Sequence, residues 1–456
     1  MKNKVLLLIL ITMAILLCSC EKPEGIENNK KYETINLNVY NWGEYISDED
    51  DEECGLFNVN AGFEEYFNTT LADKYGFYVK VNYSTYATNE DMFAKLSNSA
   101  VAYDLVIPSD YMIQKMIANN MLLPLDFSLL SNYKNISDDF KNMYYDPDNI
   151  YSVPYTYGMV GIIYNSEFVK EEDVADESWN LLWNEKYKGK ILQFNNPRDA
   201  FATAMYKEGM NINSHNPADW EKALEELKKQ KPILQGYVND EIFNKMKSAS
   251  AWISSYYAGD FLTMAADNSD LRFYYPVEGT NYFVDAMCIP TTSKHPDIAH
   301  EYINYMIGVE AATANALYIG YASPNKAVLD SEYYQEMLDY NYSIYNDDET
   351  ECLVDAWQVL YGKTKDEANV NYPFNPAYED YYKDDESGID IQTHVTTLWE
   401  SLKTENSTEL WIHITSGIIV AGVLGFAIYS TYIKKKRSKF YRNRDKELKK
   451  QRQMNE

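Results

Sequence analysis

Three aspartates with aromatic neighbours are the residues of this chain whose surroundings best predict chemistry. Asp285 lies between Val284 and Ala286 in an apolar, strand-like stretch, and a carboxylate buried there needs a partner. Asp199 and Asp260 have aromatic residues close by in the sequence. Carboxylates and aromatic faces together suit an alkyl chain that carries ammonium groups.

Two other chemistries remain open from the residues alone. Tyr256 and Tyr257 could bind ferric ion, and Asp260 with Asp285 could form the acid–base pair of an exported hydrolase. However, the chain contains no Walker motif, GxSxG elbow, HExxH pair or dinucleotide fingerprint. None of the five histidines forms a pair with metal-ligand spacing. We therefore expect a binding protein rather than an enzyme, with no cofactor and no resident metal.

The elements that must position these residues alternate between strands and helices. Helices are expected at 61–76, where Gly76 ends the helix, and at 89–99, 111–122, 217–230 and 298–317. Strands are expected at 35–42, 78–86, 102–110, 158–165, 190–194 and 283–290. This alternation predicts a parallel α/β sheet.

Ligands of open α/β sheets bind beyond the carboxyl ends of the strands. The stretches that follow predicted strands should therefore form the site. They are 41–45, 109–111 and 195–199, with Asp285 inside the last strand.

The N-terminus has the pattern of a lipoprotein export signal. Lys2 and Lys4 precede an apolar run, and residues 1–19 end at Leu17-Cys18-Ser19 before Cys20. This order resembles a bacterial lipobox, which makes Cys20 the expected lipid anchor and 20–31 a linker. An uncleaved membrane anchor is the alternative.

A second apolar run spans 411–433 and is long enough to cross a bilayer as a helix. Residues 434–456 hold 11 Lys/Arg and 3 Asp/Glu, and basic flanks stay in the cytoplasm. A transmembrane helix with a cytoplasmic tail is therefore expected, and the bulk of the chain should lie outside the membrane.

The charge of the exterior part fits a cationic ligand. The chain has a formal charge of −28, and the part between signal and tail carries 28 Lys/Arg against 66 Asp/Glu. Such a surface attracts cations and repels nucleic acid. The exterior part is long enough for two domains. Cys54, Cys288 and Cys352 have no metal-site spacing and are interpreted as structural, although one pair could form a disulfide.

Seven segments in order resemble the periplasmic spermidine/putrescine-binding proteins of ABC transporters. They are VYNWGEY (39–45), VNYSTYATNEDMFAKL (81–96), AYDLVIPSDYMIQKM (102–116), YSVPYTYG (151–158), LLWNEKYKGKI (181–191), VEGTNYFVDAMCIP (277–290) and YIGYASPNKA (318–327). The resemblance covers about 35–330 and continues more weakly to 403.

The resemblance implies a two-lobed periplasmic-binding-protein fold of type II character, α/β in class, with crossing hinge strands. Carried over, lobe 1 would be 32–157 with 284–329, and lobe 2 would be 158–283 with 330–406. The ligand would be clamped between them by a hinge motion.

The resemblance also implies the ligand contacts. They are Trp42, Glu44, Tyr45, Ser109, Tyr111, Asp199, Tyr257, Asp260, Phe283, Asp285 and Tyr321. Tyr257 and Phe283 stand where relatives carry tryptophan, and Asn196 stands where the spermidine-preferring form carries aspartate. Residues 47–70 contain extra sequence, and a glutamine of the family's C-terminal region has no assigned position here.

The function implied is an extracytoplasmic receptor that binds putrescine or spermidine and delivers it to an ABC-transporter permease. Asp260 together with Asn196 favours putrescine. The alternatives are a relative of the same fold for ferric iron, thiamine or an amino-acid derivative, and an exported hydrolase.

Overall fold

The computed structural model describes residues 31–51, 54–98, 102–341, 344–345, 351–352, 356–361, 377–378 and 390–404. The chain divides into a unit of Met1–Val395 and a unit of Thr396–Glu456. The sheet and the site described below lie in the first unit. The predicted signal (1–19), Cys20, the span 411–433 and the tail 434–456 all lie outside the described residues. Within the described ranges, no helix has the length and apolar character that a membrane crossing needs.

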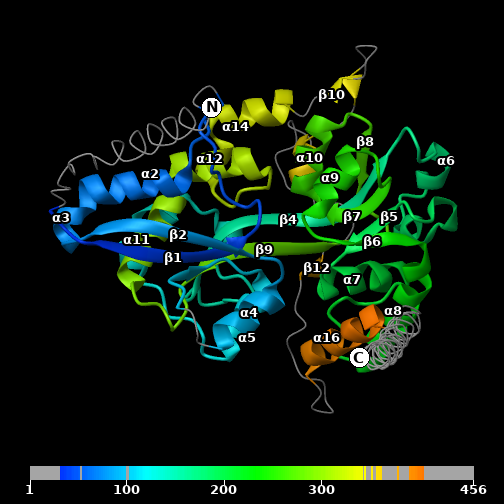
Figure 1. Ribbon diagram of the computed structural model, residues 1–456, viewed down its shortest axis with the longest axis horizontal. Helices are drawn as coiled ribbons and strands as arrows, with labels where there is room; N and C mark the ends of the chain where they lie inside the picture. The colour runs from blue at the N-terminus through cyan, green and yellow to red at the C-terminus, as the bar shows by residue number, and fades with distance from the viewer. Residues whose placement is uncertain are drawn as a thin grey trace, which may run out of the picture. The chain divides into compact units, whose positions relative to one another are not determined.

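The first half of the sheet is built around a long parallel pair. β1 (Thr34–Trp42) pairs along its whole length with β2 (Tyr78–Tyr86), and on its other side with the short β3 (Leu105–Val106). Figure 1 shows α2 (Val59–Tyr66) and α12 (Val309–Ile319) on one side of these strands, and α4 (Asn89–Ser97) and α5 (Asp110–Ala118) on the other.

The second half repeats this plan. β5 (Ile191–Phe194) lies between β6 (Leu234–Val238) and β7 (Ile253–Tyr257), and both pairings are parallel. In Figure 1, α9 (Glu241–Lys247) and α10 (Ala258–Asp267) lie on one side of this half, and α7 (Pro197–Lys207) and α8 (Pro217–Gln230) on the other. Each half is therefore an α/β layer with helices on both faces.

Two long strands join the halves. β4 (Ser152–Asn165) pairs antiparallel with β9 (Asn281–Cys288) over its first part. Over its second part it pairs with β7 and with β8 (Leu271–Tyr274), also antiparallel. β9 in turn meets β3 in the first half. The strands that cross between the halves are therefore β4 and β9 (Figure 1).

Three sequence expectations need correction. The sheet is mixed rather than parallel, because the crossing strands pair antiparallel with their neighbours. The strand expected at 102–110 is regular only at Leu105–Val106, and Pro108 offers no backbone N–H to extend a ladder. The helix expected at 298–317 is two helices, α11 (Pro296–Met306) and α12, because Gly308 has extended backbone with ψ 151°.

The other expected helices and strands are present, although some bounds differ, as for β4 and β9. The helix after β1 ends at Gly76 with a left-handed φ of 79°, after α2, a π-helical turn at Phe67–Leu71 and α3 (Ala72–Tyr75). The amphipathic pattern at 217–230 is α8, where Trp220 and Leu227 are fully buried. Burial of that apolar face holds the helix to the second half.

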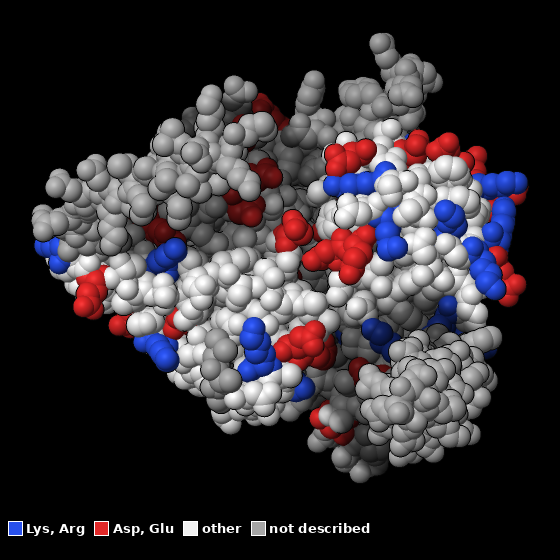
Figure 2. Space-filling model, viewed as in Figure 1, with Lys and Arg blue, Asp and Glu red and all other residues white. Residues whose placement is uncertain are grey.

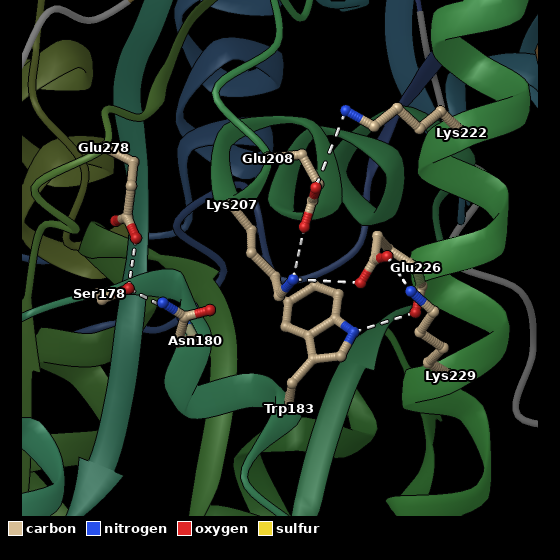
Figure 3. Close-up of polar contacts among 9 residues, drawn as sticks. All are labelled: Ser178, Asn180, Trp183, Lys207, Glu208, Lys222, Glu226, Lys229 and Glu278. Atoms are coloured by element: carbon tan, nitrogen blue, oxygen red, sulfur yellow. Dashed lines mark hydrogen bonds and ion pairs between the residues drawn. The ribbon is translucent and has the colours of Figure 1, made fainter.

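A polar network fixes the far end of α7, the helix whose first turn reaches the site. Nζ of Lys207 bonds to Glu208 at 2.7 Å and to Glu226 of α8 at 3.1 Å, above the ring of Trp183. Nε1 of Trp183 donates to the backbone oxygen of Glu226 at 3.0 Å (Figure 3). Because α7 is tied to α8 at this end, its N-terminal turn is held in place.

The remaining described elements are shorter. They include the strands β10 (Ile344–Tyr345), β11 (Glu351–Cys352) and β12 (Ala377–Tyr378), and the helices α6 (Glu171–Val174), α13 (Lys326–Leu329), α14 (Glu332–Glu336), α15 (Ala356–Tyr361) and α16 (Ile391–Thr404). Cys54 is exposed and Cys288 buried, and both are free thiols.

Candidate functional site

A pocket of about 90 Å³ lies where the parallel strands of both halves end. Residues that follow the carboxyl ends of β1, β2, β3, β5, β6 and β7 line it, as expected for an open α/β sheet. A cavity of this size has room for about six to nine water-sized groups, which suits a small, slender ligand.

All eleven residues predicted as ligand contacts line this one pocket. They come from both halves of the sheet and from the strand β9 between them. Their placement agrees with the resemblance, whereas their contact with a ligand remains a prediction.

Asp285 of β9 is the least exposed of the carboxylates that line the pocket. It is 3% exposed, and its Oδ2 accepts a 2.6 Å hydrogen bond from the hydroxyl of Tyr45. Its Oδ1 is buried and makes no hydrogen bond of normal geometry with any described residue. Burial raises the pKa of Asp285 to about 6, although the hydroxyls of Tyr45 and Ser109 partly offset this effect.

Asp199 lies in the first turn of α7 and is 4% exposed. Its Oδ2 accepts hydrogen bonds from Nδ2 of Asn196 at 2.8 Å and from the hydroxyl of Tyr257 at 2.6 Å. Its Oδ1 accepts from Nδ2 of Asn281 at 2.9 Å. These neutral donors orient the carboxylate, and its negative charge lies close enough to Asp285 to raise the pKa of that residue further.

Asp260 lies in the first turn of α10, on the second half of the sheet, and is half-buried. The hydroxyl of Tyr321 donates to its Oδ2 at 3.0 Å. Burial raises the pKa of Asp260 to about 8, and the negative charges of Asp240 and Glu44 raise it further. Asp260 therefore belongs to a second acidic group, separate from Asp199 and Asp285.

Aromatic rings line the space between the two acidic groups. Tyr321 is perpendicular to Tyr45 with centroids 5.2 Å apart, and 6.1 Å from Phe283. Tyr257 lies 5.3 Å from Phe283 and 5.2 Å from Phe194. Such faces pack methylene groups and attract cations.

The loop after β1 closes one side of the pocket. The ring of Trp42 lies 4.6 Å from that of Tyr86, and its buried Nε1 has no hydrogen-bond partner among the described residues. Glu44 is exposed and has a φ of 49°, an unusual conformation for a residue with a side chain. The loop therefore has a constrained backbone beside the pocket.

Ser109 and Tyr111 frame the pocket at the start of α5. Ser109 is the N-cap residue and forms an isolated bridge with Asp285. The hydroxyl of Tyr111 accepts from Nδ2 of Asn89 and donates to Oε1 of Glu90, both at 3.1 Å. Behind it, Lys115 donates to Oε1 of the buried Gln392 at the start of α16.

The pocket also contains residues that were not predicted as contacts. They are Gly43, Tyr86, Ala87, Asn89, Phe194, Asn196, Asn239, Asp240, Phe243 and Tyr256. Asn239, Asp240 and Phe243 follow β6, a strand that the sequence pattern did not predict. The signal that was available is an acidic residue at the start of a helix, a feature that α9 shares with α7 and α10, whose first-turn Asp199 and Asp260 also line the pocket.

The arrangement can bind an elongated cation with positive charge at both ends. Each acidic group can accept charge-assisted hydrogen bonds, and the rings between them can pack an apolar chain. The tyrosines suit ferric ion less well, because burial raises the pKa of Tyr256 well above its usual value and disfavours the phenolate that iron requires.

Comparison with known proteins gives curated relatives named for spermidine and putrescine binding. The chain is 32% identical over 292 residues to the "Spermidine/putrescine-binding periplasmic protein" of Escherichia coli K12, covering 64% of this chain and 78% of that protein. It is 27% identical to the "Putrescine-binding periplasmic protein PotF" of the same organism, covering 64% and 78%.

Solved structures agree with these relatives. The "Putative spermidine/putrescine ABC transporter from Listeria monocytogenes" is 30% identical with a TM-score of 0.64, and the match covers 81% of this chain and 99% of that one. The two-lobed α/β fold of periplasmic binding proteins is thereby confirmed. The sequence profile of a bacterial family matches residues 65–339, and the chain belongs to the bacterial extracellular solute-binding proteins.

Proposed function

We propose that this chain is the receptor of a bacterial polyamine uptake system. It binds a short linear amine such as putrescine or spermidine outside the cytoplasm and delivers it to the permease of an ABC transporter. Its family consists of solute-binding proteins, not enzymes, and the relatives described above are named for spermidine and putrescine binding.

The observation that carries the proposal is the buried carboxylate oxygen of Asp285. Oδ1 lacks a hydrogen-bond partner among the described residues, and an unpaired buried acceptor is costly. A ligand ammonium supplies both the missing donor and the missing charge. Across the aromatic rings, Asp260 offers the second carboxylate that a diamine needs.

The eleven pocket residues take defined roles in this proposal. Asp199, Asp285, Asp260 and Glu44 neutralise ammonium groups. Trp42, Tyr257, Phe283 and Tyr321 pack the methylene chain. Tyr45 and Ser109 hold the carboxylate of Asp285, and Tyr111 closes the inner end.

The two lobes would close over the ligand about the crossing strands β4 and β9. We assign 32–157 with 284–329 to lobe 1, and 158–283 with 330–406 to lobe 2. Ligand bound between Asp285 and Asp260 would then contact both lobes and stabilise the closed state.

Membrane attachment completes the proposal. Lipidation of Cys20 and a helix at 411–433 would keep the receptor beside its permease and raise its local concentration there. Deleting 411–456 tests this, with amine uptake at low external concentration as the measurement. Lower uptake at equal receptor abundance supports the tether, and unchanged uptake contradicts it.

Calorimetric titration of the purified full-length chain tests the binding function. We expect saturable one-to-one binding of putrescine or spermidine, and no comparable binding of the uncharged diol of the same length. If neither amine binds, the proposed function is wrong.

A further inference from the structure

A carboxylate at the mouth of the pocket, that of Asp240, is not among the predicted ligand contacts. Asp240 follows β6 at the start of α9 and lines the pocket with Glu44 and Asp260. Figure 2 shows Asp and Glu side chains gathered near the middle of the visible face. Asp240 and Glu44 are exposed, whereas Asp199 and Asp285 are buried.

The side chain of Asp240 does not cap α9, the helix that begins directly after this residue. Aspartate at a helix N-terminus commonly caps the first turn, yet the Asp240 carboxylate makes no capping bond. Neither Asp240 nor Glu44 makes a side-chain hydrogen bond or ion pair with another residue in the described part of the chain. The two carboxylates are therefore available to a ligand.

The opposite loop is shaped to accept Asp240. A Cβ atom on Gly43 would lie 2.7 Å from Oδ2 of Asp240, which is closer than non-bonded atoms approach. Glycine at 43 thus lets a carboxylate from the second half of the sheet lie against the loop after β1. Glu44, with its left-handed φ of 49°, follows directly.

This contact brings like charges together. Asp240 and Glu44 both raise the pKa of Asp260, because their negative charges repel the ionised form of that carboxyl group. The repulsion falls when a cation lies among them. No lysine or arginine among the described residues lines the pocket, so the cation would have to come from the ligand.

The order of groups along the pocket follows from its contacts. Tyr45 bonds to Asp285, Tyr45 packs on Tyr321, and Tyr321 bonds to Asp260. Asp240 and Glu44 act on Asp260 through their charges and are more exposed to solvent than it is, which indicates that they are at the mouth. A short diamine spans Asp285 and Asp260, and a longer chain extends past Asp260 to the mouth.

We propose that Asp240 is a specificity-determining residue that receives the outermost ammonium of a triamine-length ligand and so favours longer polyamines over diamines. This inference rests on the proposed polyamine-binding function. It assigns the preference to a residue at the mouth, separate from Asn196 at the inner end.

The test compares spermidine and putrescine on the full-length wild-type and Asp240→Asn proteins by calorimetry. Because a partly exposed ion pair is lost, we expect spermidine affinity to fall by about fivefold and putrescine affinity by much less. Asp240→Asn keeps the shape of the side chain and removes no described hydrogen bond.

Glu241→Gln is the matched control. It removes the same charge one residue away, outside the pocket, and keeps an oxygen that can accept from the backbone N–H of Asn239. The affinity ratio of the two amines should stay at the wild-type value in this variant.

The outcomes separate the two claims. If Asp240→Asn leaves the ratio unchanged, or weakens both amines equally, the role of Asp240 is refuted while the receptor function stands. If wild-type protein binds neither amine, the receptor function itself fails.

Discussion

The hydroxyl of Tyr45 lies 2.6 Å from Oδ2 of Asp285 and donates a hydrogen bond to it. The same hydroxyl contacts Oγ1 of Thr156 on β4 at 2.5 Å. Tyr45 thereby links the loop after β1 to both crossing strands. One carboxylate oxygen of Asp285 is held in place, and the other, Oδ1, remains buried without a described donor.

Replacing Asp285 with asparagine should therefore weaken amine binding strongly. Removing one partner of a buried, hydrogen-bonded charge pair costs about 2–5 kcal/mol, which corresponds to at least about a 30-fold loss of affinity. Calorimetry on Asp285→Asn measures it. The ligand-free variant should melt no lower than wild type, because the substitution removes a buried charge. A Tm well below wild type together with unchanged affinity would contradict the assignment.

Binding should depend on pH with a defined sign. An ammonium binds the ionised carboxylates, and the pKa values of Asp260 and Asp285 are raised to about 8 and about 6. Affinity should therefore rise as pH increases from 5 to about 9, and binding near pH 7 should release protons, chiefly from Asp260. Titrations in buffers of different ionisation enthalpy measure that release. Identical enthalpies in all buffers would contradict it.

The stability of the ligand-free protein should show the opposite trend. A folded-state pKa above the unfolded value means that the folded chain binds more protons. The contribution of these two carboxyl groups to stability is therefore fully present below pH 4 and is lost as pH rises through about 6 and about 8. Comparing the pH dependence of Tm for wild type and Asp260→Asn isolates the contribution of Asp260 to stability. The variant should lack the fall in Tm around pH 8 that wild type shows.

The helices and strands differ in how far the sequence alone predicts them. The helix that ends at Gly76 and the helix at 217–230 follow from local signals, a left-handed glycine and an apolar face. β4 begins at Ser152, six residues before the expected start, because Pro154 lies at a register shift that interrupts the strand pattern. Such a shift depends on the pairing with β9, which no local pattern encodes.

The site likewise contains residues that the sequence predicts and residues that only the tertiary structure reveals. The eleven expected contacts came from a resemblance in short segments, and folding brings them to one pocket. Asp240 was missed because β6 has Gln235 and Gly236 in place of alternating apolar residues, so no strand end was recognised before it. Its position opposite Gly43 is a tertiary contact between distant segments.

A pair of glycine substitutions should separate binding from stability. A Cβ atom at Gly259 would lie 2.4 Å from Cδ2 of Tyr321, so Gly259→Ala should displace that aromatic wall and lower amine affinity. A Cβ atom at Gly76 would meet nothing within 4 Å, but its φ is 79°. Gly76→Ala should cost about 1–2 kcal/mol of stability and leave affinity unchanged. Equal affinities in the two variants would contradict a role of Tyr321 in the pocket.

Asn196 offers a final test, at the inner end of the pocket. Its Oδ1 accepts from the backbone N–H of Arg198 at the start of α7, and its Nδ2 donates to Asp199. Asn196→Asp keeps the cap, since aspartate caps helices as well as asparagine does. It replaces the donor facing Asp199 with a second carboxylate, so the ligand-free protein should lose stability at neutral pH through like-charge repulsion.

Bound amine should reverse that loss, because an ammonium between the two carboxylates neutralises both. The ligand-induced rise in Tm should therefore be larger in Asn196→Asp than in wild type, by an amount that shrinks as pH falls and the carboxylates protonate. Thermal melts with and without saturating putrescine measure it. Equal Tm shifts in the two proteins at neutral pH would indicate that the ligand ammonium does not lie near Asp199. In that case Asp285 alone would bind the inner end of the amine.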